Sequence, residues 1–143
     1  MIAQSIVSEK DIVITAADFD RLQGLLNSPR YRSTQRPLLP SLREELDRAQ
    51  IVPADAVPEG LVTMHSTARV RDVRARVSET YTLVYPDEAN IDENKLSVLA
   101  PLGMALLGTR VGQIVKFDAP AGPRRLKIEE ILYQPESAGD FHL

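Results

Sequence analysis

The segment from Leu96 to Gly112 constrains the fold most, because a β-type run there meets a proline and a short apolar stretch then meets a glycine. Pro101 suits the first turn of a helix, where its missing N–H is not needed. Gly108 suits the left-handed position that follows a helix. Gly112 lies four residues later, where a new strand would begin. The order predicts a strand, a short helix over Pro101–Leu107 and a further strand.

Composition excludes several classes of protein. The chain has 143 residues, a net charge of -3 and no cysteine, so disulfides and thiolate metal sites are ruled out. The two histidines, His65 and His142, lie far apart in sequence, which disfavours a histidine-rich zinc site. The net charge argues against non-specific nucleic-acid binding as the main activity. We expect one domain, or a small domain with an appendage.

No segment has the pattern of a membrane span or a signal peptide. The longest uncharged run, Leu96–Thr109, holds a proline and two glycines and is shorter than the roughly 20 apolar residues of a span. Charged residues interrupt the stretch Met1–Asp11, which has no apolar core of signal-peptide length. We therefore expect a cytoplasmic protein that makes no membrane contact.

The N-terminal part begins with a capped amphipathic helix. Thr15 and Asp18 have capping-box spacing, with Asp in place of Glu, so Thr15 is the expected N-cap. Apolar residues then recur at steps of three and four, which places them on one helical face: Phe19, Leu22 and Leu26. The run Asn27-Ser28-Pro29 ends this helix.

A second helix is expected after the proline-punctuated segment Arg30–Pro40. Leu42, Leu46 and Ala49 repeat the helical spacing, and Val52-Pro53 closes it. The helix starts either at a capping box from Ser41 or slightly earlier, with Pro40 at its first position. Both apolar stripes are short, so the helices should pack antiparallel, either as a pair covering a sheet or as a short projecting finger.

The remainder of the chain predicts a small α+β domain of roughly five strands and the one short helix. Alternation of apolar and polar residues and flanking turn signals mark the strands. In Glu79–Tyr85, for example, Tyr81, Leu83 and Tyr85 should share one face. The expected strands are Leu61–Met64, Ala68–Arg76, Glu79–Tyr85, Ile114–Phe117 and Arg124–Tyr133.

One strand carries a cluster of basic residues: Arg69, Arg71, Arg74 and Arg76. Alternating charges protect an edge strand against pairing with another molecule, so a solvated edge is the favoured interpretation. A protein partner with an acidic surface is the next one, and nucleic acid is disfavoured by the net charge.

Four features in order resemble the C-terminal domain of the Gre transcript-cleavage factors: Ser97, Pro101, Leu106-Leu107-Gly108 and Val111-Gly112. Four further segments resemble their shorter relatives of the Rnk family (regulator of nucleoside diphosphate kinase): Glu45–Gln50, Val62–Met64, Leu83–Pro86 and Tyr133–Asp140. The resemblance implies an antiparallel helical hairpin, or short coiled-coil finger, over 1–52. A linker over 53–60 and an FKBP-like GreA/GreB C-terminal-type sheet domain over 61–143 would follow.

The resemblance also implies a function and a partner. Gre factors and Rnk-like proteins bind RNA polymerase through this domain near the secondary channel, the route by which nucleotides enter. The matching docking residues here are Ser97, Leu99, Ala100, Pro101, Leu102 and Met104. Leu99 stands where Gre factors tend to carry an acidic residue, while Leu102, Leu106 and Leu107 suit a core. The family name links these proteins to regulation of nucleoside diphosphate kinase. We expect a monomer that competes with Gre-type factors.

The expected finger tip lacks the chemistry of transcript cleavage. Cleavage needs carboxylates that help to hold Mg²⁺ and orient its water. From Asn27 to Leu39 there is no Asp or Glu, and the tip carries Arg30, Arg32 and Arg36. The one acidic pair on the finger, Glu44 and Asp47, suits a solvated helix face better than a metal site. We therefore expect no metal, no cofactor and no enzymatic activity.

Two other functions remain open. An adaptor could bind a different protein through the same C-terminal face. An FKBP-type prolyl isomerase is a minor alternative that the FKBP-like domain type suggests. FKBP pockets are lined with aromatic residues, whereas this chain has no Trp, three Phe and four Tyr. Fold kinship does not carry activity with it.

Overall fold

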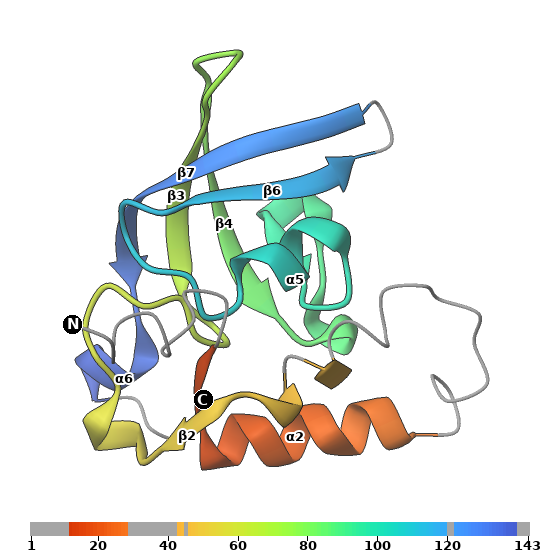
Figure 1. Cartoon of the computed structure of the whole chain (residues 1–143), viewed down its shortest axis with the longest axis vertical. Coiled ribbons are helices and arrows are strands. Elements are labelled where there is room, and N and C mark those ends of the chain that lie inside the picture. Colours follow the sequence, from red (N-terminus) through yellow and green to blue (C-terminus); the bar gives the residue numbers. More distant parts are fainter. Residues whose placement is uncertain (1–11, 29–42, 45, 120–121, 140–143) are drawn as a thin grey trace, which may run out of the picture.

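A mixed five-stranded sheet forms the centre of the molecule (Figure 1). The computed structural model describes residues 12–28, 43–44, 46–119 and 122–139. The strand order is β5-β4-β3-β7-β6; β4 and β5 run parallel, and the other neighbours run antiparallel. The strands are β3 (Thr67–Asp72), β4 (Ser78–Val84), β5 (Lys95–Ser97), β6 (Ile114–Ala119) and β7 (Gly122–Tyr133). The predicted α+β class is confirmed.

The first helix forms as predicted. Thr15 caps α2 (Ala16–Asn27), and its Oγ1 accepts a hydrogen bond of 3.1 Å from the backbone N–H of Asp18. Leu22 and Leu26 are buried on the inner face of the helix. The helix ends at Asn27, before the proline that cannot continue it.

The second helix ends earlier than predicted, while its predicted start at Pro40 or Ser41 lies outside the described residues. Residues 43–44 and 46–47 are helical, but Gln50–Val52 forms strand β2 instead of the last helical turn. This strand pairs in parallel with β1 (Val13–Thr15), and the N–H of Gln50 donates to the carbonyl of Ile12 at 2.9 Å. The β-branched residues Ile51 and Val52 fit a strand better than a helix end.

Arg43 connects the second helical stretch to the C-terminal end of α2. Its guanidinium donates to the carbonyl of Leu26 and to Oδ1 of Asn27, each at 3.3 Å. A cation at the C-terminal end of α2 satisfies free carbonyls and complements the helix dipole. Arg43 therefore holds the second helical stretch beside the C-terminal end of α2.

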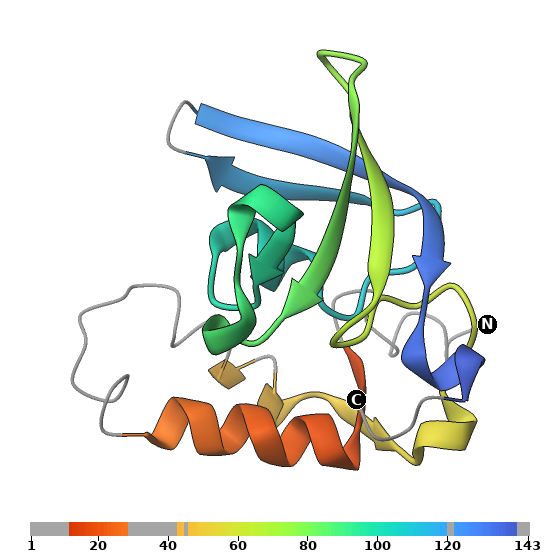
Figure 2. The same cartoon turned by 180° about the vertical axis from the view of Figure 1, so that it is seen from behind.

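One hydrophobic core joins the N-terminal elements to the sheet. α2 lies along one end of the sheet, as the front and back views show (Figure 1, Figure 2). In the part of the hairpin that the structure describes, the helix therefore covers the sheet domain, which was one of the two expected arrangements. The core residues from the hairpin are Ile12, Ile14, Leu22, Leu26 and Leu46; those from the sheet domain include Val62, Met64, Leu83, Val98, Leu106 and Ile128.

Two strand predictions need correction. Leu61–Met64 is not a strand: it makes one isolated bridge, from Leu61 to Arg110, and its four side chains are all buried. Strand β3 stops at Asp72 and does not continue to Arg76. The Asp72 carboxylate oxygen Oδ1 accepts from the N–H groups of Arg74 and Ala75, at 2.9 and 2.8 Å, and so forms a turn.

The edge-strand interpretation of Arg69 and Arg71 is wrong. β3 is the central strand, with β4 on one side and β7 on the other, so it has no free edge to protect. The strand order depends on pairing between β3 and β7, which are distant in sequence. The local alternation of charged and apolar residues cannot reveal which strands pair.

Helix α5 (Pro101–Leu106) starts at Pro101 as predicted and is followed by a left-handed Gly108 with φ of 79°. Two glycines fix its position. A Cβ on Gly103 would lie 2.0 Å from the carbonyl oxygen of Ser97, and a Cβ on Gly108 would lie 2.4 Å from the side chain of Ile12. Only glycine permits both approaches.

Short helices complete the structure. The 3₁₀ helices are η1 (Ala54–Ala56), η2 (Pro86–Glu88) and η3 (Ile91–Glu93), and a last α-helix, α6 (Pro135–Ala138), was not predicted. Among the described residues, no helix has the length and apolar character needed to cross a membrane.

The contact between Gly108 and Ile12 predicts a large mutational effect. Gly108→Ala should lower the free energy of unfolding by about 3 kcal/mol, through left-handed strain plus the clash with Ile12. Gly112→Ala is the matched control, because Gly112 has φ of 93° but a Cβ added there would meet no atom within 4 Å; it should cost about 1 kcal/mol. Urea denaturation of both variants measures the difference, and equal losses would refute tight packing at Ile12.

Candidate docking surface

The expected docking segment is a tight turn between β5 and α5. Oγ of Ser97 accepts a hydrogen bond of 3.1 Å from the N–H of Leu99, and the Ser97 carbonyl accepts one of 3.0 Å from the N–H of Ala100. The N–H of Val98 donates to the carbonyl of Val84 at 2.9 Å, which extends the pairing of β4 and β5. These bonds fix the backbone that leads into α5.

The structure divides the six expected docking residues into two groups. Pro101 is exposed, and Ser97 and Ala100 are half-buried. The others are core residues, with exposed fractions of 5% for Leu99 and 8% each for Leu102 and Met104. The core role expected of Leu102, Leu106 and Leu107 is confirmed. The surface that the segment offers to a partner therefore consists of Ser97, Ala100 and Pro101.

A buried carboxyl joins α2 to the sheet domain. Asp18 is only 2% exposed, and the Tyr85 hydroxyl donates to its Oδ1 at 3.0 Å. Burial raises the pKa of Asp18, while the hydrogen bond from Tyr85 opposes that shift. Burial and the neighbouring Asp18 also raise the pKa of Tyr85. The sequence placed Asp18 at capping-box spacing from Thr15 but did not reveal its burial, because its partner Tyr85 lies 67 positions away.

His65 packs against this pair. Its ring meets that of Tyr85 edge-on, with 5.6 Å between centroids, and its Nε2 lies 2.8 Å from Oε1 of Glu88. The backbone of His65 has φ of 67°, a left-handed conformation that is uncommon for histidine. Sequence reasoning gave this residue no role, and the structure gives it a packing role beside Tyr85.

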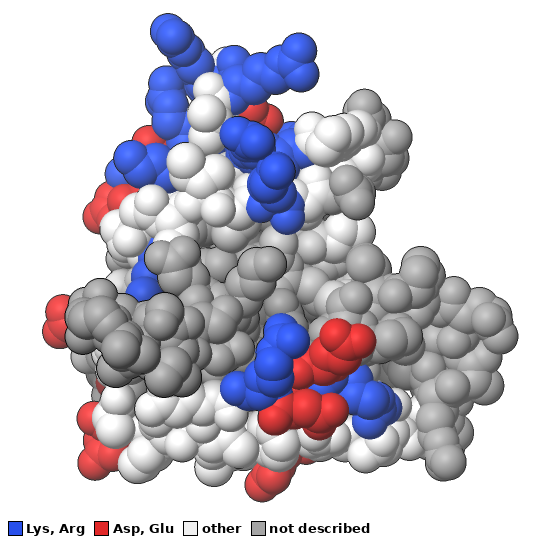
Figure 3. Space-filling model, viewed as in Figure 1, with Lys and Arg blue, Asp and Glu red and all other residues white. Residues whose placement is uncertain are grey.

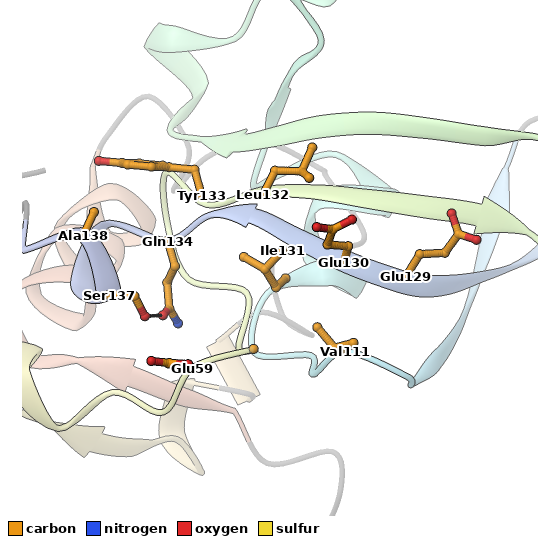
Figure 4. A pocket seen from close by; sticks show the side chains of 11 residues that line it. Glu59, Val111, Glu129, Glu130, Ile131, Leu132, Tyr133, Gln134, Ser137 and Ala138 are labelled. Atoms are coloured by element: carbon orange, nitrogen blue, oxygen red, sulfur yellow. Dashed lines mark hydrogen bonds between the residues drawn. The ribbon is translucent and has the colours of Figure 1, made fainter.

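An open hollow of about 550 Å³ lies along the C-terminal half of β7 (Figure 4). Gln134 is one of its lining residues: Nε2 donates to the carbonyls of Pro58 and Leu61, at 3.0 and 2.8 Å, and Oε1 accepts from the hydroxyl of Ser137. Glu129, Glu130, Ile131 and Leu132 also line the hollow. Nothing in the sequence pattern predicted it. No group of three or more potential metal ligands occurs among the described residues.

The expected finger residues are only partly visible. Arg30, Arg32 and Arg36 lie outside the described residues. Glu44 and Asp47 are both exposed on the second helical stretch, as a solvated helix face requires.

Two family descriptions match the chain. Residues 57–133 match "Transcription elongation factor, GreA/GreB, C-term", and residues 10–52 match "Rnk N-terminus". Residues 53–56 lie between the two matches.

Full-length similarity agrees with these matches. The "Regulator of nucleoside diphosphate kinase" of Escherichia coli K12 is 38% identical over 138 residues, which cover 96% of this chain and 100% of the relative. GreA of Methylococcus capsulatus is 33% identical over 93 residues, which cover 64% of this chain and 59% of that protein. Among solved structures, a GreA/GreB elongation factor from Nitrosomonas europaea has a TM-score of 0.73 and 35% identity, covering 86% of this chain and 98% of that one.

The buried Asp18 predicts a pH-dependent stability. Because its folded pKa is raised above the ordinary 3.8, the folded state holds the proton more tightly than the unfolded state does. The contribution of Asp18 to the free energy of unfolding is therefore greatest at low pH, and it decreases as pH rises from about 3.8 through the raised pKa. Asp18→Asn removes the titration.

The difference in free energy of unfolding between wild type and Asp18→Asn should thus fall as pH rises over that range. Urea denaturation from acid to neutral pH measures it, with Asp20→Asn as the control at an exposed position of the same helix. A difference that does not change with pH would contradict the assignment.

Proposed function

The chain belongs to the Rnk family, with a GreA/GreB-type C-terminal domain, and from this membership we propose that it regulates transcription by binding bacterial RNA polymerase. The contact is made by the C-terminal domain near the secondary channel. The protein competes there with Gre-type factors and does not stimulate transcript cleavage. It acts as a binding protein without catalysis of its own.

The observation that carries the proposal is the similarity to the solved GreA/GreB factor. A TM-score of 0.73 at 35% identity over 98% of that chain reflects a shared fold, and the docking segment lies inside the GreA/GreB-type region of residues 57–133. The rigid turn from Ser97 to Pro101 supports the same assignment, because preformed surfaces bind without an ordering cost.

The absence of cleavage follows from the expected finger. Helix α2 has 12 residues, spans only about 18 Å and lies along the sheet domain, so it offers a short reach toward a deeply placed active centre. From Asn27 to Leu39 the sequence offers three arginines and no carboxylate. Guanidinium groups only donate hydrogen bonds and cannot ligate Mg²⁺.

The regulation of nucleoside diphosphate kinase named in the E. coli relative fits the same proposal. We propose that any such effect of this chain passes through transcription. No nucleotide-binding glycine loop is present in the sequence, and neither histidine lies in a context suited to phosphate transfer.

A charge at Pro101 should weaken polymerase binding without unfolding the protein. Glutamate is favourable in the first turn of a helix, so Pro101→Glu keeps α5 while it alters the exposed contact surface. We expect a loss of affinity of about tenfold for purified bacterial RNA polymerase, measured by biolayer interferometry. Pro53→Glu, at an exposed proline before η1, is the matched control. Equal affinities for the two variants would move the contact away from this segment.

A cleavage assay on backtracked complexes tests the second part of the proposal. Saturating protein should leave the rate of transcript cleavage at its intrinsic level, because the tip supplies no metal ligand. A Gre factor on the same complexes is the positive control. Stimulated cleavage would overturn the interpretation of the arginine-bearing tip.

A further inference from the structure

The outer face of the sheet carries basic residues directly opposite one another. In the register of β6, β7 and β3, Lys116 lies opposite Arg125, and Lys127 lies opposite Arg71. Arg125 and Lys127 are two apart on β7 and therefore point to the same side. We call these four residues the basic face.

This arrangement is unfavourable for the isolated protein. Like charges at directly opposed positions of a sheet destabilise it. The acidic residues of β7 do not neutralise them all, because Glu129 and Glu130 pair with Arg69, at 3.3 and 2.6 Å. Among the side chains that the structure describes, no ion pair is formed by Lys116, Arg125 or Lys127.

The surrounding surface extends the positive charge and adds apolar groups. The turn between β3 and β4 projects beyond the other strands, and lysine and arginine gather around it and the nearby strands (Figure 1, Figure 3). Arg74 and Arg76 lie in this turn, between Val73 and Val77, which are 45% and 53% exposed. Ile114, opposite Lys127, is 56% exposed.

A hollow lies where the turn meets the basic face. It has a volume of about 520 Å³, and Val73, Arg74, Lys116 and Arg125 are among its lining residues. Arg124 also lines it but is neutralised by Asp72, at 2.9 Å. The unpaired cations and the exposed valine together form a concave surface.

We propose that the basic face and the β3–β4 turn form a docking surface for an acidic protein segment that also carries apolar side chains. Carboxylates would neutralise the opposed cations, and apolar groups would cover Val73 and Ile114. Arginine beside exposed apolar residues is a common composition of protein interfaces. This inference concerns a surface separate from the Ser97–Pro101 segment and does not depend on the proposed function.

Nucleic acid fits this surface less well. Stacking platforms for single strands use aromatic side chains, whereas the exposed groups beside these cations are Val73, Val77 and Ile114. Tyr81 pairs with the buried Ala68 and so lies on the inner face. The chain as a whole carries a net charge of -3, which opposes long-range attraction to a polyanion.

The test uses the full chain and three probes. The first is a synthetic helical peptide that carries glutamate on one face and leucine on another. The second is the same peptide with serine in place of leucine, and the third is a single-stranded RNA of similar length. Amide chemical shifts in ¹H–¹⁵N spectra report the site and the affinity. We expect the first peptide to bind saturably on β6, β7 and the β3–β4 turn, more tightly than either other probe. Raising NaCl from about 50 to about 500 mM should weaken it.

Lys116→Glu separates binding from folding. It replaces a like-charge pair with an opposite-charge pair across from Arg125, so the melting temperature should rise by about 2 °C. Affinity for the glutamate–leucine peptide should nevertheless fall about tenfold. Arg110→Glu, at an exposed arginine outside the basic face, makes the same change of charge and should leave affinity within about twofold of wild type.

Three results would overturn the proposal. The glutamate–leucine peptide could cause no saturable shift, Lys116→Glu and Arg110→Glu could weaken peptide binding equally, or the RNA could bind more tightly than the peptide. The last result would assign the surface to nucleic acid.

Discussion

The close approach of Ile12 to Gly108 is the contact on which the rest of the structure depends. Ile12 leads directly into β1 and α2, while Gly108 ends the turn after α5, so their contact places the N-terminal elements on the sheet domain. The N–H of Gly108 also donates to the carbonyl of Val62 at 2.8 Å. A side chain at position 108 would separate all of these elements, because its Cβ would overlap Ile12.

The same packing shapes the surface that we assign to polymerase binding. Gly103 sits against the carbonyl of Ser97, so α5 cannot move away from the end of β5 without opening the core beneath Leu102. The turn that presents Ser97, Ala100 and Pro101 is therefore rigid. In the proposed function this surface would serve as a preformed contact, and the three arginines expected at the tip would supply no ligand for Mg²⁺. The basic face adds a second surface, of different chemistry, on the same small sheet.

Local signals in the sequence predicted the elements whose causes are local. Thr15 as the cap of α2, Pro101 at the start of α5 and Gly108 after its end are each set by neighbours within four residues. The errors have non-local causes. Gln50–Val52 continues the helical spacing of Leu42, Leu46 and Ala49, and only its pairing with β1 makes it a strand.

For the candidate sites, too, local features could be predicted from the sequence, whereas contacts between distant residues could not. The position of the docking segment followed from its motif, but the burial of Leu99 and Met104 depends on the core around them. The basic cluster was visible in sequence, yet its meaning changed once β3 proved central and Lys116, Arg125 and Lys127 joined it from other strands. Asp18 was recognised by its capping-box spacing from Thr15, while its contact with Tyr85 required the fold.

Equilibrium competition measures whether this protein and Gre factors share one site on RNA polymerase. A fluorescently labelled Gre factor is bound to purified bacterial polymerase, and the unlabelled protein is titrated in while anisotropy is followed. If the two proteins share that site, the Gre factor is completely displaced at saturation, and the reverse titration gives the same result. Simultaneous binding of both proteins, or no binding of this one, would contradict a shared site.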